Sequence, residues 1–85
     1  MRSFSYTVTD PVGIHARPAG LLAKEARRFV CEIKVEKGGA RADAKRLIAV
    51  MGLAVKCGDE IKLTLDGADE DAAAEALEQF VKEHL

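Results

Sequence analysis

The stretch Gly13-Ile14-His15-Ala16-Arg17-Pro18-Ala19 connects a predicted first strand to a predicted first helix. Pro18 has no N–H to donate and its φ is held near the helical value, so it is tolerated in the first turn of a helix and not in its interior. Apolar residues then follow at the spacing of one helix face: Ala19, Leu22, Ala23 and Ala26. We therefore expect His15 at the N-terminus of this helix, around the N-cap position.

The residues around His15 are suited to binding an anion. The N-terminus of a helix carries unpaired N–H groups and a partial positive charge, and it attracts phosphate and other anions. Arg17 adds a permanent cation whose planar guanidinium matches phosphate oxygens. Because an imidazole can act as a nucleophile, the stretch predicts a phosphoryl acceptor at His15. On spacing alone, a histidine that only caps the helix is the alternative.

The sequence around His15 offers little to other kinds of chemistry. No second metal ligand is suggested close by in the chain, and the only serines, Ser3 and Ser5, lie in the predicted first strand. We therefore expect no metal site, no serine triad and no cofactor. The two cysteines, Cys31 and Cys57, are expected to be reduced thiols, with a regulatory disulfide as the alternative.

The size and charge of the chain narrow the classes of function. Its 85 residues and formal net charge of −1 predict one small domain, residues 1–85. A chain of this length has a thin core, which favours a surface site served by partner proteins. There is no basic excess and no Trp, so no nucleic-acid partner is expected. The N-terminal residues lack the apolar run of a signal peptide and no segment has membrane-spanning length. We therefore expect a cytoplasmic monomer that does not insert into membranes.

Periodicity along the chain predicts seven elements in the order β-α-β-β-α-β-α. Alternating apolar and polar residues predict strands at 3–8, 31–36, 40–43 and 61–65, with a hairpin at Gly38-Gly39. Helical spacing predicts a first helix that runs to about Arg28 or Phe29, a short helix within 47–55 and a last helix with Asp69 at its N-cap position. This order favours a two-layer α+β fold with an antiparallel sheet and helices on one face. It leaves the order of the strands in the sheet open.

Two features suggest a surface that binds partners. The nine residues 47–55 carry no charge, and two overlapping apolar sets there have helical spacing. A short helix cannot bury both sets against one core, so an exposed apolar patch is expected; a fully buried short helix is the alternative. Gly20 lies inside the predicted first helix, where glycine costs up to about 1 kcal/mol relative to alanine. It indicates either close packing or bare backbone left open for a partner.

The stretch 13–19 resembles the active-site signature of HPr, the histidine phosphocarrier of the bacterial phosphoenolpyruvate-dependent sugar phosphotransferase system. Chain length, element order and the turn at 66–70 are similar too, so the resemblance covers essentially the whole chain. It implies an open-faced β-sandwich in which a four-stranded antiparallel sheet carries three helices on one face. It also implies a phosphocarrier and not a stand-alone enzyme.

The resemblance assigns roles to particular residues. In the HPr family the imidazole Nδ1 accepts a phosphoryl group from phospho-Enzyme I and passes it to the A domain of a sugar-specific Enzyme II. Here that residue is His15, and the phosphoryl oxygens would be held by Arg17 and by the backbone amides of Ala16 and Arg17. The resemblance further implies a docking surface for both partner enzymes, with Val50 pointing inward beside it: Ala16, Gly20, Leu47, Ile48 and Met51.

One residue departs from the family pattern. Many HPr proteins carry a regulatory serine at the start of the second, short helix, where this chain has Arg46. No serine occurs after Ser5, so we expect no switching by phosphoserine. Arg46 places a fixed positive charge where a phosphoserine would add roughly two negative charges.

Two other functions remain open at this point. The first is a non-catalytic regulatory or binding module that shares the HPr fold, including a paralogue in a nitrogen-regulatory branch of the same system. The second is a small-molecule-binding α+β domain of ferredoxin-like type, which would leave His15 without a role.

Overall fold

The sheet of the computed structural model, which describes residues 1–85, has four antiparallel strands. They are β1 (Arg2–Thr7), β2 (Glu32–Lys37), β3 (Ala40–Asp43) and β4 (Glu60–Asp66), in the spatial order β1-β4-β2-β3. β4 pairs with both β1 and β2, and β3 pairs with β2. β1 and β3 are therefore the edge strands, which decides the strand order that the sequence left open.

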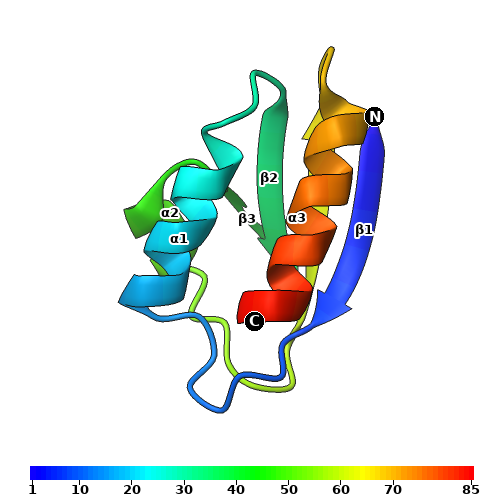
Figure 1. The fold of residues 1–85 in the computed structure, drawn as a ribbon. Helices are drawn as coiled ribbons and strands as arrows, with labels where there is room; N and C mark the ends of the chain where they lie inside the picture. Colours follow the sequence, from blue (N-terminus) through cyan, green and yellow to red (C-terminus); the bar gives the residue numbers. More distant parts are fainter.

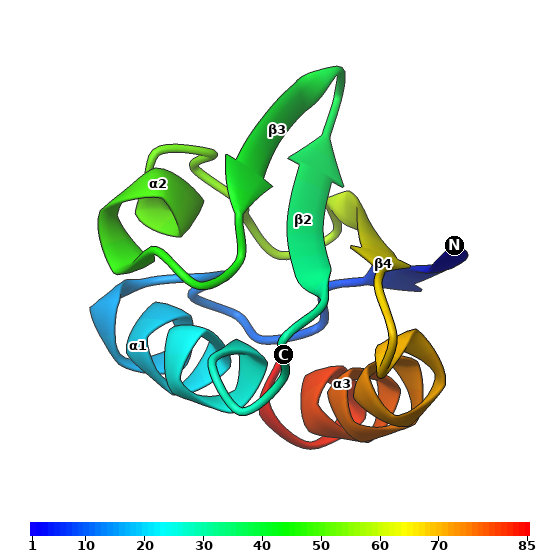
Figure 2. The same ribbon diagram turned by 90° about the horizontal axis from the view of Figure 1, so that it is seen from above.

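Three helices form the second layer: α1 (Ala16–Ala26), α2 (Leu47–Met51) and α3 (Glu70–His84). α1 and α3 lie along one face of the sheet (Figure 1). The view from above places α2 at the outer end of this layer, next to α1 (Figure 2). No helix covers the other face of the sheet. The predicted two-layer α+β fold, an open-faced sandwich, is confirmed.

The hydrophobic core lies between the sheet and the helices. Along β2 and β4 every second side chain points inward, as expected for strands with one solvated face. No polar or charged side chain is buried among them. Fully burying one Leu, Ile or Val contributes roughly 1.5–3 kcal/mol, so this layer dominates the stability of the fold. Its fully buried strand and helix residues include Ile33, Val35, Ile61, Leu63, Leu65, Ala19, Leu22, Leu77 and Val81.

The end of α1 differs from the prediction. The helix ends at Ala26, before Arg28 and Phe29. The N–H groups of Arg28 and Phe29 bond to the carbonyls three residues earlier, those of Glu25 and Ala26, at 3.2 Å each. The last turn is therefore tightened from α to 3₁₀ geometry, a common way to satisfy the final carbonyls of a helix.

Asp69 is the N-cap residue of α3, as the sequence predicts, but its side chain makes no capping hydrogen bond with this helix. Its two carboxylate oxygens accept hydrogen bonds from the backbone N–H groups of Val30 and Cys31, each at 2.9 Å. Its φ of −105° and ψ of 23° also differ from the extended conformation of an ordinary N-cap residue. Asp69 therefore ties the start of α3 to the segment that leads into β2. These hydrogen bonds, that of Val30 first, lower the pKa of the Asp69 carboxyl.

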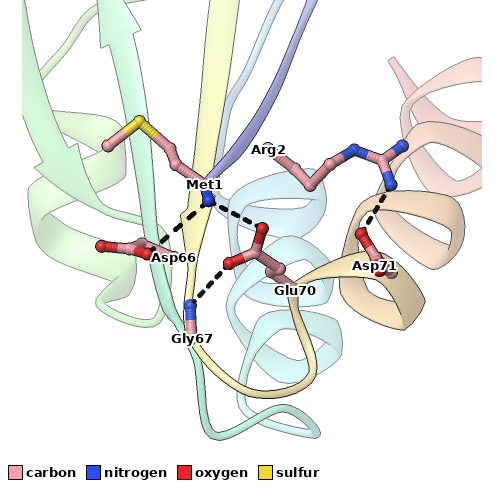
Figure 3. A network of polar contacts seen from close by, with 6 residues as sticks. All are labelled: Met1, Arg2, Asp66, Gly67, Glu70 and Asp71. Carbon is pink, nitrogen blue, oxygen red and sulfur yellow. Dashed lines mark hydrogen bonds and ion pairs between the residues drawn. The ribbon is translucent and has the colours of Figure 1, made fainter.

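Further polar contacts join β1 to the start of α3 (Figure 3). The Met1 ammonium lies 2.8 Å from one carboxylate oxygen of Glu70, and the other oxygen accepts a hydrogen bond from the Gly67 N–H at 3.1 Å. Arg2 donates a hydrogen bond to Asp71 at 2.7 Å. Both acids lie in the first turn of α3, where negative charge is favoured by the helix dipole.

Candidate functional site

His15 is the N-cap residue of α1, as the sequence predicts. Its backbone is extended, with φ −118° and ψ −170°, and its carbonyl accepts the N–H of Ala19 at 2.9 Å. Its imidazole makes no capping hydrogen bond with the helix. The side chain is exposed. The ring is therefore not committed to the helix and is accessible to an incoming group.

The first turn of α1 offers two unpaired hydrogen-bond donors beside His15. The N–H groups of Ala16 and Arg17 precede the first intrahelical bond and have no acceptor in the structure. Pro18 contributes no N–H at all. The first turn also contains no acidic residue that would neutralise the positive end of the helix dipole. Together these features form an open anion-binding site at the N-terminus of α1, directly beside the His15 imidazole.

The loop before α1 is held against the segment that follows α2. The Ile14 N–H donates to the Val55 carbonyl at 3.0 Å, and the Ile14 side chain is buried in the core. Gly13 has a φ of +77°, and a Cβ at this position would overlap the Val55 carbonyl oxygen. Only glycine therefore allows the loop to approach residues 55–56 this closely. This contact determines where His15 leaves the loop.

The segment after α2 contains a strained residue. Ala54 has a φ of +51° and is the only non-glycine residue with a positive φ. The Lys37 ammonium donates to the carbonyl oxygens of Leu53 and Ala54, at 3.3 and 2.9 Å. These bonds hold the turn that presents the Val55 carbonyl to the loop before α1. The strained residue thus lies in the segment that positions the loop before α1. Unfavourable backbone conformations are common near functional sites.

Arg17 is exposed and makes neither an ion pair nor a side-chain hydrogen bond. Together with His15 it lines a surface hollow of about 320 Å³. An unpaired guanidinium beside a free imidazole and two free amides can hold the oxygens of a phosphoryl group. The complete lining of this hollow is Asp10, His15, Arg17, Pro18, Leu21 and His84.

α2 presents part of its apolar surface to solvent. Ile48 is 77% exposed and Met51 is 38% exposed, whereas Val50 is fully buried. Leu47 is half-buried and packs against the core, so it is less available than the sequence suggested. The alternative of a fully buried short helix is wrong. α2 contacts α1, which places this apolar patch next to the helix that begins at His15.

Arg46 is the N-cap residue of α2 and its side chain makes no capping bond. It is exposed and lines a second hollow of about 530 Å³ with Arg27, Leu47, Ile48 and Ala49. Gly20 lies in α1, and no atom lies within 4 Å of where its Cβ would be. Close packing therefore does not explain this glycine, and the bare backbone remains as the interpretation.

The two cysteines differ in environment, and both are free thiols. Cys31 is buried, and its burial, with a smaller contribution from Asp69, raises the pKa of its thiol to about 11. Cys57 is exposed, and its Sγ lies 3.7 Å from the carbonyl oxygen of Thr9. Since the thiolate is the reactive form, Cys31 is protected from oxidation.

Sequence reasoning placed His15, Ala16 and Arg17 together but missed two residues of the same hollow. Asp10 reaches it from the loop after β1, and His84 reaches it from the last turn of α3. No spacing along the chain links residue 84 to residue 15. Only the packing of α3 beside α1 brings them to one place.

Comparisons with known proteins point to one family. A family model described as the PTS HPr component phosphorylation site matches residues 2–83. Phosphocarrier protein HPr of Mycoplasma capricolum subsp. capricolum is 43% identical over 79 residues, which cover 93% of this chain and 89% of the relative. A solved structure of the histidine-containing phosphocarrier protein of Mycoplasma has a TM-score of 0.94 at 40% identity, covering 96% of this chain and 93% of the other. Crh of Bacillus subtilis, solved as a dimer with a swapped domain, has a TM-score of 0.78 at 39% identity, covering 94% and 92%.

The chain therefore belongs to the HPr family of phosphocarrier proteins of the phosphotransferase system. The resemblance drawn from the stretch 13–19 is confirmed by sequence and by fold. None of the three helices combines the length and the apolar character that crossing a membrane requires.

Proposed function

We propose that His15 accepts a phosphoryl group from phospho-Enzyme I and passes it to the A domain of a sugar-specific Enzyme II. The observation that carries this proposal is the free imidazole of His15 at the N-cap of α1, beside two backbone N–H groups without acceptors. Arg17, which has no other partner, completes the set of donors. A nucleophile and an anion site at adjacent positions are what phosphoryl transfer needs.

In each transfer the bond between phosphorus and the donor breaks as a bond between phosphorus and the acceptor forms. A ring nitrogen of His15 that carries a lone pair attacks phosphorus, and the donor takes back the electrons of its own bond to phosphorus. The amides of Ala16 and Arg17 and the Arg17 guanidinium stabilise the charge on the phosphoryl oxygens. The site is open to solvent, so the group is held loosely enough to be passed on. The chain acts as a carrier whose partner enzymes supply the remaining catalytic groups.

The docking surface proposed for both partners combines the start of α1 with α2. Ile48 and Met51 present exposed apolar area beside α1, and the open backbone at Gly20 allows a partner to approach closely. Apolar patches of this kind are typical of protein interaction sites. We further propose that the carrier is a cytoplasmic monomer. Because Arg46 occupies the position of the regulatory serine, it would not be regulated by serine phosphorylation. The proposed contact residues are Ala16, Gly20, Leu47, Ile48 and Met51.

The test is phosphorylation in a purified system. The protein is incubated with phosphoenolpyruvate and a catalytic amount of the host's Enzyme I, and its intact mass is recorded with His15→Ala as the control. We expect the gain of one acid-labile phosphoryl group, absent from the control, because His15 is the only histidine at the N-cap of α1, next to the free amides of Ala16 and Arg17.

A protein that stays unmodified with the host's own Enzyme I would contradict the carrier function. The chain would then be a non-catalytic module that shares the HPr fold and binds partners through α2. A paralogue of a nitrogen-regulatory branch would be identified by phosphorylation with the Enzyme I of that branch alone.

A further inference from the structure

The hollow beside His15 contains a second imidazole, that of His84, which the proposed function does not use. His84 lies in the last turn of α3, and it lines the hollow together with His15 and Arg17. Figure 1 shows the end of the chain, in red, close to the loop that leads from β1 into α1. Two histidines from opposite ends of the sequence thus border one anion site.

The position of His84 is fixed by the residue that follows it. The carbonyl oxygen of Leu85 accepts hydrogen bonds from the N–H groups of Thr9 and Asp10, at 2.8 and 2.9 Å. The Leu85 side chain is buried in the core. The last turn of α3 is therefore fastened to the loop before α1, and His84 is held beside the hollow by the fold.

The imidazole of His84 has N–H capacity that no group in the protein uses. It stacks on Phe80, with the ring centroids 4.6 Å apart. Its Nε2 lies 4.0 Å from the nearest carboxylate oxygen, that of Glu83, which is too long for a hydrogen bond. An imidazole in either charge state has at least one N–H to donate. The stacking holds the ring in place and leaves that donor free.

The charged groups that face the hollow would not by themselves balance the charge of a phosphoryl group, so a further hydrogen-bond donor would stabilise it. Arg17 is the only permanent cation in its lining, and Asp10 contributes a carboxylate, one oxygen of which accepts the Val12 N–H at 2.9 Å. A phosphoryl group on His15 adds about two further negative charges to this place. Donors that reach its oxygens stabilise the phosphorylated state relative to the free one.

We propose that His84 donates a hydrogen bond to a phosphoryl oxygen of phospho-His15 and thereby stabilises the phosphorylated carrier. The inference rests on the proposed function, since it requires His15 to carry the group. No bond between phosphorus and His84 forms or breaks, because the imidazole acts as a hydrogen-bond donor alone. His84 is therefore a phosphoryl-binding residue that is supplied by α3, outside the stretch 13–19.

The test is a competition between two carriers for one phosphoryl group. Wild-type protein and the His84→Leu variant are mixed in equal amounts with catalytic Enzyme I and a limiting amount of phosphoenolpyruvate. Reversible transfer then distributes the phosphoryl group, and intact mass separates the four species. We expect roughly 3- to 10-fold enrichment of the phosphoryl group on the wild type, the size of one lost hydrogen bond.

Two variants separate hydrogen bonding from structure and from charge. His84→Gln keeps an N–H donor and should recover part of the enrichment. Lys82→Gln removes a cation from the same turn, but Lys82 pairs with Glu78 and lines another part of the surface, so this variant should compete equally with the wild type.

The ring resonances of His84, followed by NMR, should shift when His15 is phosphorylated.

Equal distribution between the wild type and His84→Leu would overturn the inference and leave the carrier function intact. A phosphoryl group on His84 in the His15→Ala variant would also overturn it, because His84 would then be an acceptor. Failure of both proteins to become phosphorylated would instead count against the proposed function itself.

Discussion

At the scale of single residues, Gly13 and Gly20 lie on either side of the start of α1 for opposite physical reasons. Gly13 has a φ of +77°, and its close approach to Val55 leaves no room for a Cβ. Gly20 has ordinary helical geometry, and a Cβ there would meet no atom within 4 Å. The fold requires the first glycine and tolerates replacement of the second.

We predict that Gly20→Ala raises the free energy of unfolding by about 0.5–1 kcal/mol, because alanine is favoured over glycine inside a helix. The same variant should accept the phosphoryl group more slowly, because the new methyl occupies the proposed docking surface. Urea denaturation measures the first effect and transfer from Enzyme I the second. Unchanged transfer would remove Gly20 from the docking surface.

The matched control is Gly13→Ala. It should lower stability, because alanine disfavours a positive φ and its Cβ would collide with the Val55 carbonyl oxygen. The opposite signs of the two alanine variants would then separate a structural glycine from a functional one.

At the scale of elements, α2 is a helix that could not exist alone. It spans Leu47–Met51 and begins at Arg46 without a capping side chain, and isolated helices of this length are unstable in water. Val50, which is fully buried, and Leu47, which packs against the core, hold it in place. Ile48 is not part of the core and its exposed side chain is available to a partner.

Replacing Ile48 by Ala should weaken docking without weakening the fold. Since the side chain is 77% exposed, the change in unfolding free energy should stay within about 0.5 kcal/mol. Loss of an apolar contact at the centre of an interface should raise the KM for Enzyme I by roughly 5- to 10-fold. Steady-state transfer assays over a range of carrier concentrations measure this change.

Val30→Ala serves as the comparison for Ile48→Ala. Val30 is 82% exposed and β-branched, but it lies beyond the C-terminal end of α1, away from His15. Its truncation should leave the KM unchanged. Equal effects of the two variants would show that general surface hydrophobicity, and not the α2 patch, determines docking.

At the scale of the whole molecule, carboxylates join segments that are distant in the chain. Asp69 accepts backbone bonds from Val30 and Cys31, and Glu70 pairs with the Met1 ammonium. These contacts lower the pKa of both carboxyl groups: the hydrogen bond to Val30 is the largest cause for Asp69, and that to the Met1 ammonium for Glu70. The charged form of each acid is therefore the form that the fold prefers.

The lowered pKa values predict a loss of stability in acid. An acid whose pKa is lower in the folded state stabilises the fold above its unfolded pKa, roughly 4, and loses this contribution as the pH falls through the folded pKa. We expect Asp69→Asn to be less stable than the wild type at pH 7. The two free energies of unfolding should converge as the pH falls below roughly 4. Urea denaturation at several pH values checks this.

Asp71→Asn provides the control for Asp69→Asn. Asp71 is highly exposed and pairs only with Arg2 at the surface, and such pairs contribute little to stability. This variant should follow the wild-type stability curve at every pH. A constant difference between wild type and Asp69→Asn down to low pH would show that the charge of Asp69 is not the cause.

The sequence alone determined the elements, the fold class and the centre of the site. Alternation and helical spacing are local properties, and they predicted all four strands and three helices to within a few residues. Pro18 and the apolar spacing behind it placed His15 at the N-cap of α1, with Ala16 and Arg17 beside it. Neighbours along the chain remain neighbours in space, so the stretch 13–19 could be interpreted without the fold.

Only the tertiary structure shows which residues that are far apart in the sequence come into contact. The strand order β1-β4-β2-β3, the use of Asp69 across the fold and the half-buried position of Leu47 depend on which elements pack together. The placement of His84 beside His15 depends on the same packing, because the bonds from Thr9 and Asp10 to Leu85 fasten the end of α3 to the loop before α1. Contacts between distant residues follow from packing of the whole core, and no local pattern in the sequence encodes them.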